Sequence, residues 1–200
     1  MSITKKGERS REIIVDRAAQ LFSRKGFYGT SMEDIAEAVG LTKGAIYSHF
    51  GSKEDICYAV LEKAGRMIQG KVSPYVRSQS NACDQLLAMI QGYRSYAEDR
   101  VFEGGCIILN LAVEMDDINE GLRNDLAARI MGWRRWIMRI VEEGKGRKEV
   151  RDDVDSDQLA TLIISSLQGA MIQFKMFSDL KFYDQTYEFF QRYLDLEVRA

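Results

Sequence analysis

The segment from Thr30 to Lys53 constrains this 200-residue chain more than any other, because it predicts two short helices separated by a glycine. Thr30 with Glu33 three residues later is the capping-box pattern that opens a helix. Apolar residues then recur at helical spacing and would share one face: Met32, Ile35, Ala36 and Val39. Gly40 can adopt the left-handed conformation that ends a helix, and Thr42 can cap the next one. This pattern is typical of a helix-turn-helix.

The second helix of the pair, expected over about 43–49, has few residues to bury. Ile46 and Phe50 can face a core, whereas small or polar residues occupy its N-terminal end: Thr42, Lys43, Gly44 and Ala45. A short helix of this kind suits the major groove of DNA, where its N-terminal residues meet base edges. The small size of Gly44 and Ala45 lets the backbone approach the duplex. The sequence therefore predicts a DNA-binding protein.

Three hydrogen-bond donors lie at positions from which they can reach phosphate oxygens: Tyr47, His49 and Lys53. Lys53 begins a helix that Ser52 can cap, with Asp55 as the reciprocal acidic residue. Phosphate contacts of this kind fix the register on the duplex without reading its sequence. The alternative for the whole segment is an ordinary helical hairpin with a solvated polar face.

The residues IAEAVGLTKGAIYSHFGSKE at 35–54 resemble the signature of the tetracycline-repressor (TetR) family. The order of elements is also similar, with an amphipathic helix over 9–25, then GFYGT at 26–30, then the helix-turn-helix. The match is specific over about the first 55 residues and rests on length and helical pattern beyond them. The resemblance implies an all-α fold, with a three-helix DNA-binding domain over 1–52 and a ligand-binding and dimerisation domain over 53–200.

The resemblance also implies which residues touch DNA. It assigns phosphate contacts to Thr30, Tyr47, His49 and Lys53, and base reading to Thr42, Lys43, Gly44 and Ala45. Ser31, beside Thr30, joins these candidates. Glu33 stands where the tetracycline repressor itself has a basic base-reading residue, so the operator sequence cannot be transferred from that protein.

The charge of the chain is slightly acidic and unevenly distributed. A formal net charge of −2 and a pI near 5.6 argue against indiscriminate coating of nucleic acid. The N-terminal arm is nevertheless basic, with Lys5, Lys6, Arg9 and Arg11. Such an arm can add phosphate or minor-groove contacts, or it can be a solvated, disordered tail. With 46% apolar residues and a single proline, the chain has enough apolar material for a large helical core.

Reactive and metal-binding residues are scarce. The three cysteines, Cys57, Cys83 and Cys106, are irregularly spaced and form neither a zinc pattern nor an even disulfide set. The single histidine, His49, is already assigned to DNA, and no glycine-rich phosphate loop appears. We therefore expect no enzyme activity, no cofactor and no metal. Because neither a secretory segment nor a membrane-spanning run is apparent, we expect a cytoplasmic protein.

Beyond residue 53 the chain reads as helices separated by short turns. The expected helices are 53–72, ended by Pro74, then 81–101, 106–115, 119–143, 156–178 and 183–198. The helix over 81–101 is capped by Asn81, and the one starting at 156 by Asp155 or Ser156. A polar break is expected at Asp116-Asp117.

The last two expected helices carry more apolar surface than one subunit's core requires. The first is apolar nearly all round: Leu159, Leu162, Ile163, Ile164, Leu167, Ala170, Met171, Phe174 and Phe177. The second has a stripe of Tyr187, Phe190, Tyr193 and Leu194. The resemblance implies that both helices pair with their two-fold copies, which gives a homodimer suited to a palindromic operator. The alternative is a wholly intramolecular core.

An effector pocket is implied by the resemblance, among the C-terminal helices. Candidate lining residues are Met89, Tyr93, Tyr96, Trp133, Trp136, Met171 and Phe174. Trp133 and Trp136 are three residues apart and share a side of their helix. A stripe of methionine and aromatic residues is more often core than pocket, but as a pocket wall it would suit an apolar or aromatic ligand. The leading hypothesis is a repressor released from its operator by such a molecule.

Cys106 supports an alternative hypothesis. It follows Gly104-Gly105 and would begin a short helix, where free amides and the helix dipole favour a thiolate. By resemblance to regulators with Gly-Cys at this place, Cys106 would sense electrophiles or oxidants with Lys175 nearby. A buried cysteine is, however, usually an inert apolar residue. An adaptor that has lost DNA binding and a helical enzyme are less favoured, because the candidate DNA-contacting residues are all present.

Overall fold

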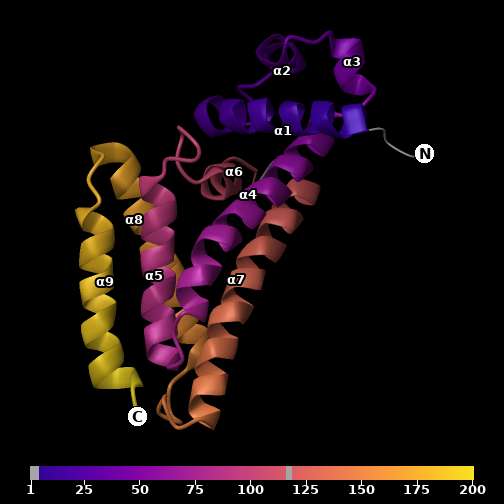
Figure 1. The fold of residues 1–200 in the computed structure, drawn as a ribbon. Coiled ribbons are helices and arrows are strands. Elements are labelled where there is room, and N and C mark those ends of the chain that lie inside the picture. Colours follow the sequence, from indigo (N-terminus) through magenta and orange to yellow (C-terminus); the bar gives the residue numbers. More distant parts are fainter. Residues whose placement is uncertain (1–4, 116–118) are drawn as a thin grey trace. The chain divides into compact units, whose positions relative to one another are not determined.

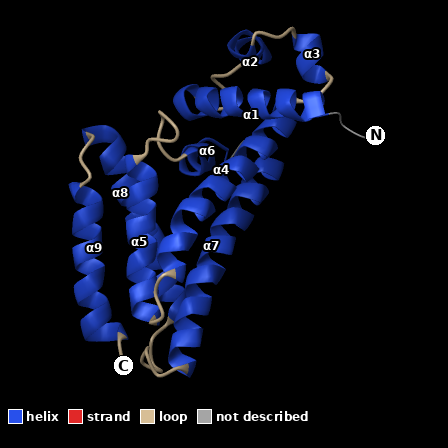
Figure 2. Cartoon of the chain, viewed as in Figure 1, coloured by secondary structure: helices blue, strands red, loops and turns tan. Residues whose placement is uncertain are grey.

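The computed structural model describes residues 5–115 and 119–200, which form helices joined by turns and loops, with no β-strand among them (Figures 1 and 2). The predicted all-α fold is confirmed. The described residues pack as two compact units, one from 5–66 with 102–115 and 119–127, and the other from 67–101 with 128–200. The functional boundary expected at residue 52 stays a prediction, since the packing units follow a different division.

The first unit holds the helix-turn-helix and the segments that support it. Its helices are α1 (Lys5–Lys25), α2 (Met32–Val39), α3 (Lys43–Tyr47), α6 (Ile107–Met115) and the beginnings of α4 (Lys53–Arg77) and α7 (Glu120–Gly146). Ile14, Ala18 and Phe22 follow one another at every fourth residue of α1 and are fully buried. Their spacing places them on one face of α1, which explains why this segment is helical.

The first helix begins earlier than the sequence indicates, so the basic residues expected in an N-terminal arm lie on it. Helix α1 begins at Lys5, four residues before the expected start at Arg9. Arg9 and Arg11 therefore lie on α1, and the Arg11 guanidinium stacks 4.1 Å from the centre of the Phe50 ring. This cation–π contact couples the basic residue to the helix-turn-helix core instead of leaving it in a tail.

The second unit is built on α5 (Ala82–Glu98), α8 (Ser156–Phe177) and α9 (Lys181–Tyr193), which pack against one another (Figure 2). The end of α4, most of α7 and a closing π-helical turn (Leu194–Val198) complete it. The expected caps of α5 and α8 are confirmed. Asn81 accepts hydrogen bonds from Cys83 N and Asp84 N, and Asp155 accepts from Asp157 N and Gln158 N.

Two helix ends differ from the sequence prediction. Pro74 lies inside α4, which continues to Arg77. A proline inside a helix removes one hydrogen bond and costs about 3 kcal/mol, but Ile68, Val72 and Val76 are buried at every fourth residue and carry the apolar face past it. Helix α7 likewise runs through Gly144 to Gly146. The expected break at 116–117 lies outside the described residues.

Gly104 generates a stability prediction. A Cβ at this position would lie 1.7 Å from the Ser23 carbonyl oxygen, a backbone atom that cannot move independently. Gly104→Ala should therefore lower the free energy of unfolding by about 1–3 kcal/mol, the usual cost of overpacking, in urea titration. Gly70→Ala is the matched control, because Gly70 lies inside α4 and a Cβ there meets nothing within 4 Å. The control should leave stability unchanged or raise it by up to about 1 kcal/mol through helix propensity. Equal stability of Gly104→Ala and wild type would contradict the packing described here.

Candidate nucleic-acid interface

The start of α2 is capped one residue later than the sequence suggests. Ser31 is the N-cap, with its hydroxyl accepting from Asp34 N at 3.1 Å while the Asp34 carboxylate accepts from Ser31 N at 2.8 Å. The predicted Thr30–Glu33 pair was wrong because the Thr30 hydroxyl donates to the Gly26 carbonyl at 2.7 Å instead. The Lys25 ammonium, together with Ser31, holds the pKa of Asp34 well below its ordinary value.

The turn between α2 and α3 has the geometry expected from its glycine. Gly40 has a φ of 73°, in the left-handed region, and its amide donates to the Glu37 carbonyl. Thr42 caps α3 by accepting from Ala45 N at 3.2 Å. Ile46 and Phe50 are buried, as expected for the residues that anchor α3.

The N-terminal end of α3 faces solvent. Thr42, Lys43 and Gly44 are exposed and Ala45 is half-buried. Tyr47 is 50% exposed, and His49 is half-buried. The four expected base-reading positions therefore form one continuous segment at the tip of a short helix whose opposite side is fixed in the core. This is the arrangement that a recognition helix needs.

An ion pair that the sequence did not suggest links the two helices of the motif. The Lys43 ammonium contacts the Glu33 carboxylate, and both side chains are largely exposed. Lys43 is thus paired with an acid on α2. The pair places the negative charge of Glu33 next to the candidate base-reading residues, where it would repel the phosphates of an approaching duplex.

Thr30 and Lys53 are placed differently from the other predicted phosphate-binding residues. Thr30 is fully buried, so its hydroxyl is not available to a phosphate in this structure. The half-buried Lys53 donates from Nζ to the carbonyl oxygens of Phe27 and Thr30, both at 2.9 Å. Its ammonium also lies 4.1 Å from the centre of the Phe27 ring. Sequence patterns could not reveal this role of Lys53, because its hydrogen-bond partners are backbone atoms.

The thiols are all buried. Burial raises the pKa of Cys57 to about 12, assisted by the charge of Asp125, and raises that of Cys83 to about 11. Both are therefore protonated at neutral pH and are poor nucleophiles. Cys106 lies just before α6, close to the expected position, and is 3% exposed. Lys175, in the other unit, is exposed on α8.

Most of the candidate effector-binding residues form an aromatic core in the second unit. Met89, Tyr93, Tyr96, Met171 and Phe174 are buried, and Trp133 and Trp136 are half-buried. Tyr93 lies at the centre of this group, with ring centres 5.8 Å from Tyr96 and 5.5 Å from Trp133. The edge-to-face contact with Trp133 is a favoured aromatic arrangement.

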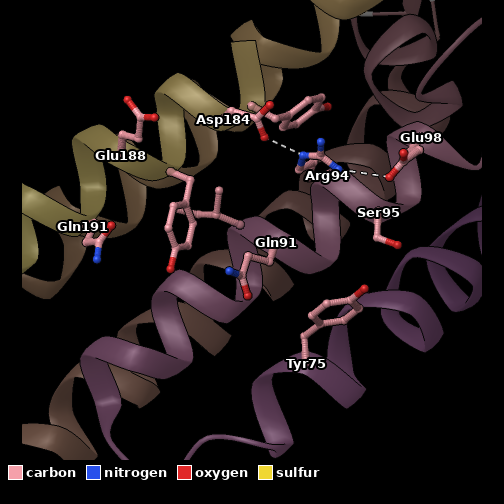
Figure 3. A pocket seen from close by; sticks show the side chains of 11 residues that line it. Tyr75, Gln91, Arg94, Ser95, Glu98, Asp184, Glu188 and Gln191 are labelled. Atoms are coloured by element: carbon pink, nitrogen blue, oxygen red, sulfur yellow. Dashed lines mark hydrogen bonds and ion pairs between the residues drawn. The ribbon is translucent and has the colours of Figure 1, made fainter. Parts of the chain in front are cut away.

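A polar groove of about 590 Å³ opens elsewhere in the same unit, and none of the predicted effector-binding residues lines it (Figure 3). Its walls come from α4, α5 and α9: Tyr75, Ile90, Gln91, Arg94, Ser95, Glu98, Tyr183, Asp184, Tyr187, Glu188 and Gln191. The Arg94 guanidinium donates to Asp184 at 2.6 Å and to Glu98 at 3.0 Å. These carboxylates raise the pKa of Arg94. No sequence pattern indicated the groove, since its residues are distributed over three helices.

Two structural absences hold for residues 5–115 and 119–200. None of the helices there is long and apolar enough to cross a membrane. The same residues contain no group of three or more histidine, cysteine or acidic side chains that could hold a metal ion.

Comparison with known proteins assigns both parts of the chain. Residues 14–60 match the family described as bacterial regulatory proteins, tetR family, and residues 82–190 match the tetracyclin repressor-like C-terminal domain. The crystal structure of a TetR transcriptional regulator from Chloroflexus aurantiacus J-10-FL is 36% identical, with a TM-score of 0.93 over 98% of this chain and 100% of that chain. The HTH-type transcriptional repressor DhaR of Mycobacterium sp. strain GP1 is 28% identical, over 83% of this chain and 82% of its own.

A further structure shows the same fold bound to DNA. The TetR-family regulator CifR, solved as a cysteine mutant with 26-base-pair double-strand operator DNA, has a TM-score of 0.82. The alignment covers 90% of this chain and 94% of that one at 20% identity, so it supports the fold alone.

Lys43→Ala should weaken binding to the best operator by about 1–3 kcal/mol and relax the preference at one base pair, if Lys43 contacts a base edge. Titration of labelled duplexes that differ at single positions measures both effects. Tyr47→Phe is the comparison variant, because a lost phosphate contact should weaken all sequences alike. Equal losses on operator and random DNA for Lys43→Ala would show that Lys43 contacts only phosphate.

Glu33→Gln should have the opposite effect. Removing the carboxylate that pairs with Lys43 frees the ammonium and deletes a negative charge from the exposed surface. We expect several-fold tighter binding to every duplex and a steeper salt dependence. Glu62→Gln makes the same charge change in an exposed α4 ion pair outside the helix-turn-helix, and it should change affinity much less. Unchanged affinity in Glu33→Gln would place Glu33 away from the duplex.

Proposed function

Because this chain belongs to the TetR family of DNA-binding transcriptional regulators, which are not enzymes, we propose that it is a repressor released from a palindromic operator by a small molecule. The observation that carries the DNA half of this proposal is the exposed N-terminal end of α3, at which Lys43 projects beside the small residues Gly44 and Ala45. That the regulator represses rather than activates transcription is proposed because the relative DhaR is a transcriptional repressor.

A homodimer is part of this proposal, supported by the outer faces of α8 and α9. Large apolar side chains are exposed there at helical spacing: Leu162, Ile172 and Met176 on α8, and Phe189 on α9. Ile172 is 52% exposed and Met176 is 71% exposed. Leu162, Ile172 and Met176 are separated by ten and four residues, which keeps them on one side of the helix. An exposed apolar stripe of this kind is typical of a protein–protein interface. A two-fold copy of the same chain is the proposed partner, because a symmetric dimer also doubles the number of phosphate contacts.

Ile172→Glu should convert the dimer to a monomer at micromolar concentration, since it places a charge in the centre of the proposed interface. Analytical ultracentrifugation measures the change. Val113→Glu is the control, because Val113 is 73% exposed but lies on α6, outside the proposed interface. Sedimentation of the wild type as a monomer would contradict the assembly.

The effector is proposed to be an apolar or aromatic molecule that binds among the aromatic residues around Tyr93. It must bind the released state better than the DNA-bound state, because equal affinity for both shifts nothing. By linkage, operator DNA must then weaken effector binding by the same factor, a coupling of about 1–3 kcal/mol.

Native mass spectrometry of the freshly purified protein can identify a co-purifying molecule, and its effect on operator binding can then be titrated. Trp133→Ala should change the concentration needed for release while leaving effector-free DNA affinity nearly intact. Glu188→Gln, on the rim of the polar groove, should leave that concentration unchanged. If Glu188→Gln changed that concentration and Trp133→Ala did not, the effector site would lie in the groove instead.

The thiol-sensing alternative depends on Cys106, since burial and the raised pKa values of Cys57 and Cys83 disfavour the thiolate at those two positions. The burial of Cys106 does not favour it. Brief treatment with an electrophile followed by peptide mass spectrometry tests this alternative. Modification of Cys106 before the other two thiols, accompanied by loss of operator binding, would replace small-molecule release with covalent sensing.

A further inference from the structure

The turn between α1 and α2, residues 26–30, is held from two sides by side chains of opposite charge. Lys53 donates to its carbonyl groups, as described above. On the amide side, the Glu114 carboxylate of α6 accepts from Phe27 N at 2.9 Å and from Tyr28 N at 2.8 Å. Each carboxylate oxygen therefore takes one of two consecutive backbone amides.

The backbone of the turn is shaped to receive this carboxylate. Gly26 has a φ of 76°, a left-handed conformation that favours glycine, and a Cβ there would lie 2.6 Å from Glu114 Oε2. A left-handed residue followed by consecutive free amides makes an anion-binding concavity. Hydrogen bonds to an ionised acceptor are the stronger kind in proteins. The turn therefore provides a binding site for the side chain of Glu114, which is 86 residues from Tyr28 in the sequence.

Glu114 lies on a helix, α6, whose position is itself fixed by hydrogen bonds. The segment that leads into α6 contacts the same end of α1, where Gly104 N donates to the Ser23 hydroxyl at 2.8 Å in a buried hydrogen bond. The Asn110 side-chain amide donates to the Gly104 carbonyl at 2.9 Å. Helix α6 is thus fixed to the end of α1 one turn before Glu114, which limits where the carboxylate can lie.

The turn controls both ends of the DNA-binding motif. It leads directly into Ser31, the N-cap of α2, and it fixes Lys53, the first residue of the helix that follows α3. We propose that Glu114 is a positioning residue for DNA recognition: its two amide contacts hold the 26–30 turn, and through it the orientation of the helix-turn-helix. This inference rests on the DNA-binding role of α3 and on neither the effector nor the dimer.

Glu114→Gln tests the inference with almost no change in shape. A glutamine offers one acceptor oxygen, and its NH₂ group then faces a backbone amide donor. We expect operator affinity to fall about tenfold without effector, because the turn must then be ordered on DNA binding without one hydrogen bond to a charged group. In hydrogen–deuterium exchange, the amides of Phe27 and Tyr28 should lose protection while those in the middle of α1 keep theirs.

Glu103→Gln is the matched control. Glu103 also pairs with the end of α1, through an exposed ion pair to Arg24 at 3.2 Å, and an exposed pair contributes little. Its replacement removes the same charge and should change operator affinity less than twofold. Thermal unfolding of both variants shows whether a loss of affinity reflects loss of the fold.

Three results would overturn the inference. Free exchange of the Phe27 and Tyr28 amides in the wild type would show that Glu114 does not hold them, whether or not the variant folds. Lost protection in Glu114→Gln with unchanged operator affinity would show that the turn does not position the motif. Equal losses in Glu103→Gln would assign the effect to charge alone. By contrast, a wild type that keeps both amides protected but binds no operator would refute the proposed function together with the positioning role.

Discussion

The peptide groups of residues 26–30 are the point on which the DNA-binding part of this protein depends. The α1–α2 turn has carbonyl groups that accept from Lys53 and amides that donate to Glu114, so side chains from α4 and α6 stabilise it through its own backbone. Because these contacts are made to backbone atoms, they depend on the position and conformation of the turn more than on which side chains the turn carries. The buried face of α1 and the burial of Ile46 then fix α3 against the same unit, which leaves its N-terminal end free for a ligand.

Sequence patterns predicted the features that depend on local chemistry. Helix periodicity, the left-handed Gly40 and the caps at Thr42, Asn81 and Asp155 were all readable, since each follows from residues within four positions of one another. The errors arose where a side chain has two possible local partners, or where tertiary packing decides. Thr30 hydrogen-bonds backward to Gly26 instead of capping α2, and burial of Val72 and Val76 carries α4 through Pro74.

The candidate sites divide in the same way. The exposed residues of α3 were identified from their position in a motif, whereas the roles of Lys53 and Glu114 were hidden because their partners are backbone atoms far away in sequence. The polar groove was missed for a related reason, since Arg94, Asp184 and Tyr75 meet there from three helices. The aromatic residues around Tyr93 were found by pattern, yet they make mutual contacts that a core also makes, so their role as an effector site stays a prediction.

We propose above all that α3 reads a specific, two-fold symmetric DNA sequence. Selection of duplexes from a random library by the full-length protein, followed by sequencing, tests it most directly. We expect one enriched motif with inverted half-sites, whose centres lie roughly 34 Å apart or at a multiple of that distance, as two symmetry-related recognition helices require. Recovery of no enriched sequence, or of a single half-site without its inverted repeat, would contradict a dimeric, sequence-specific regulator.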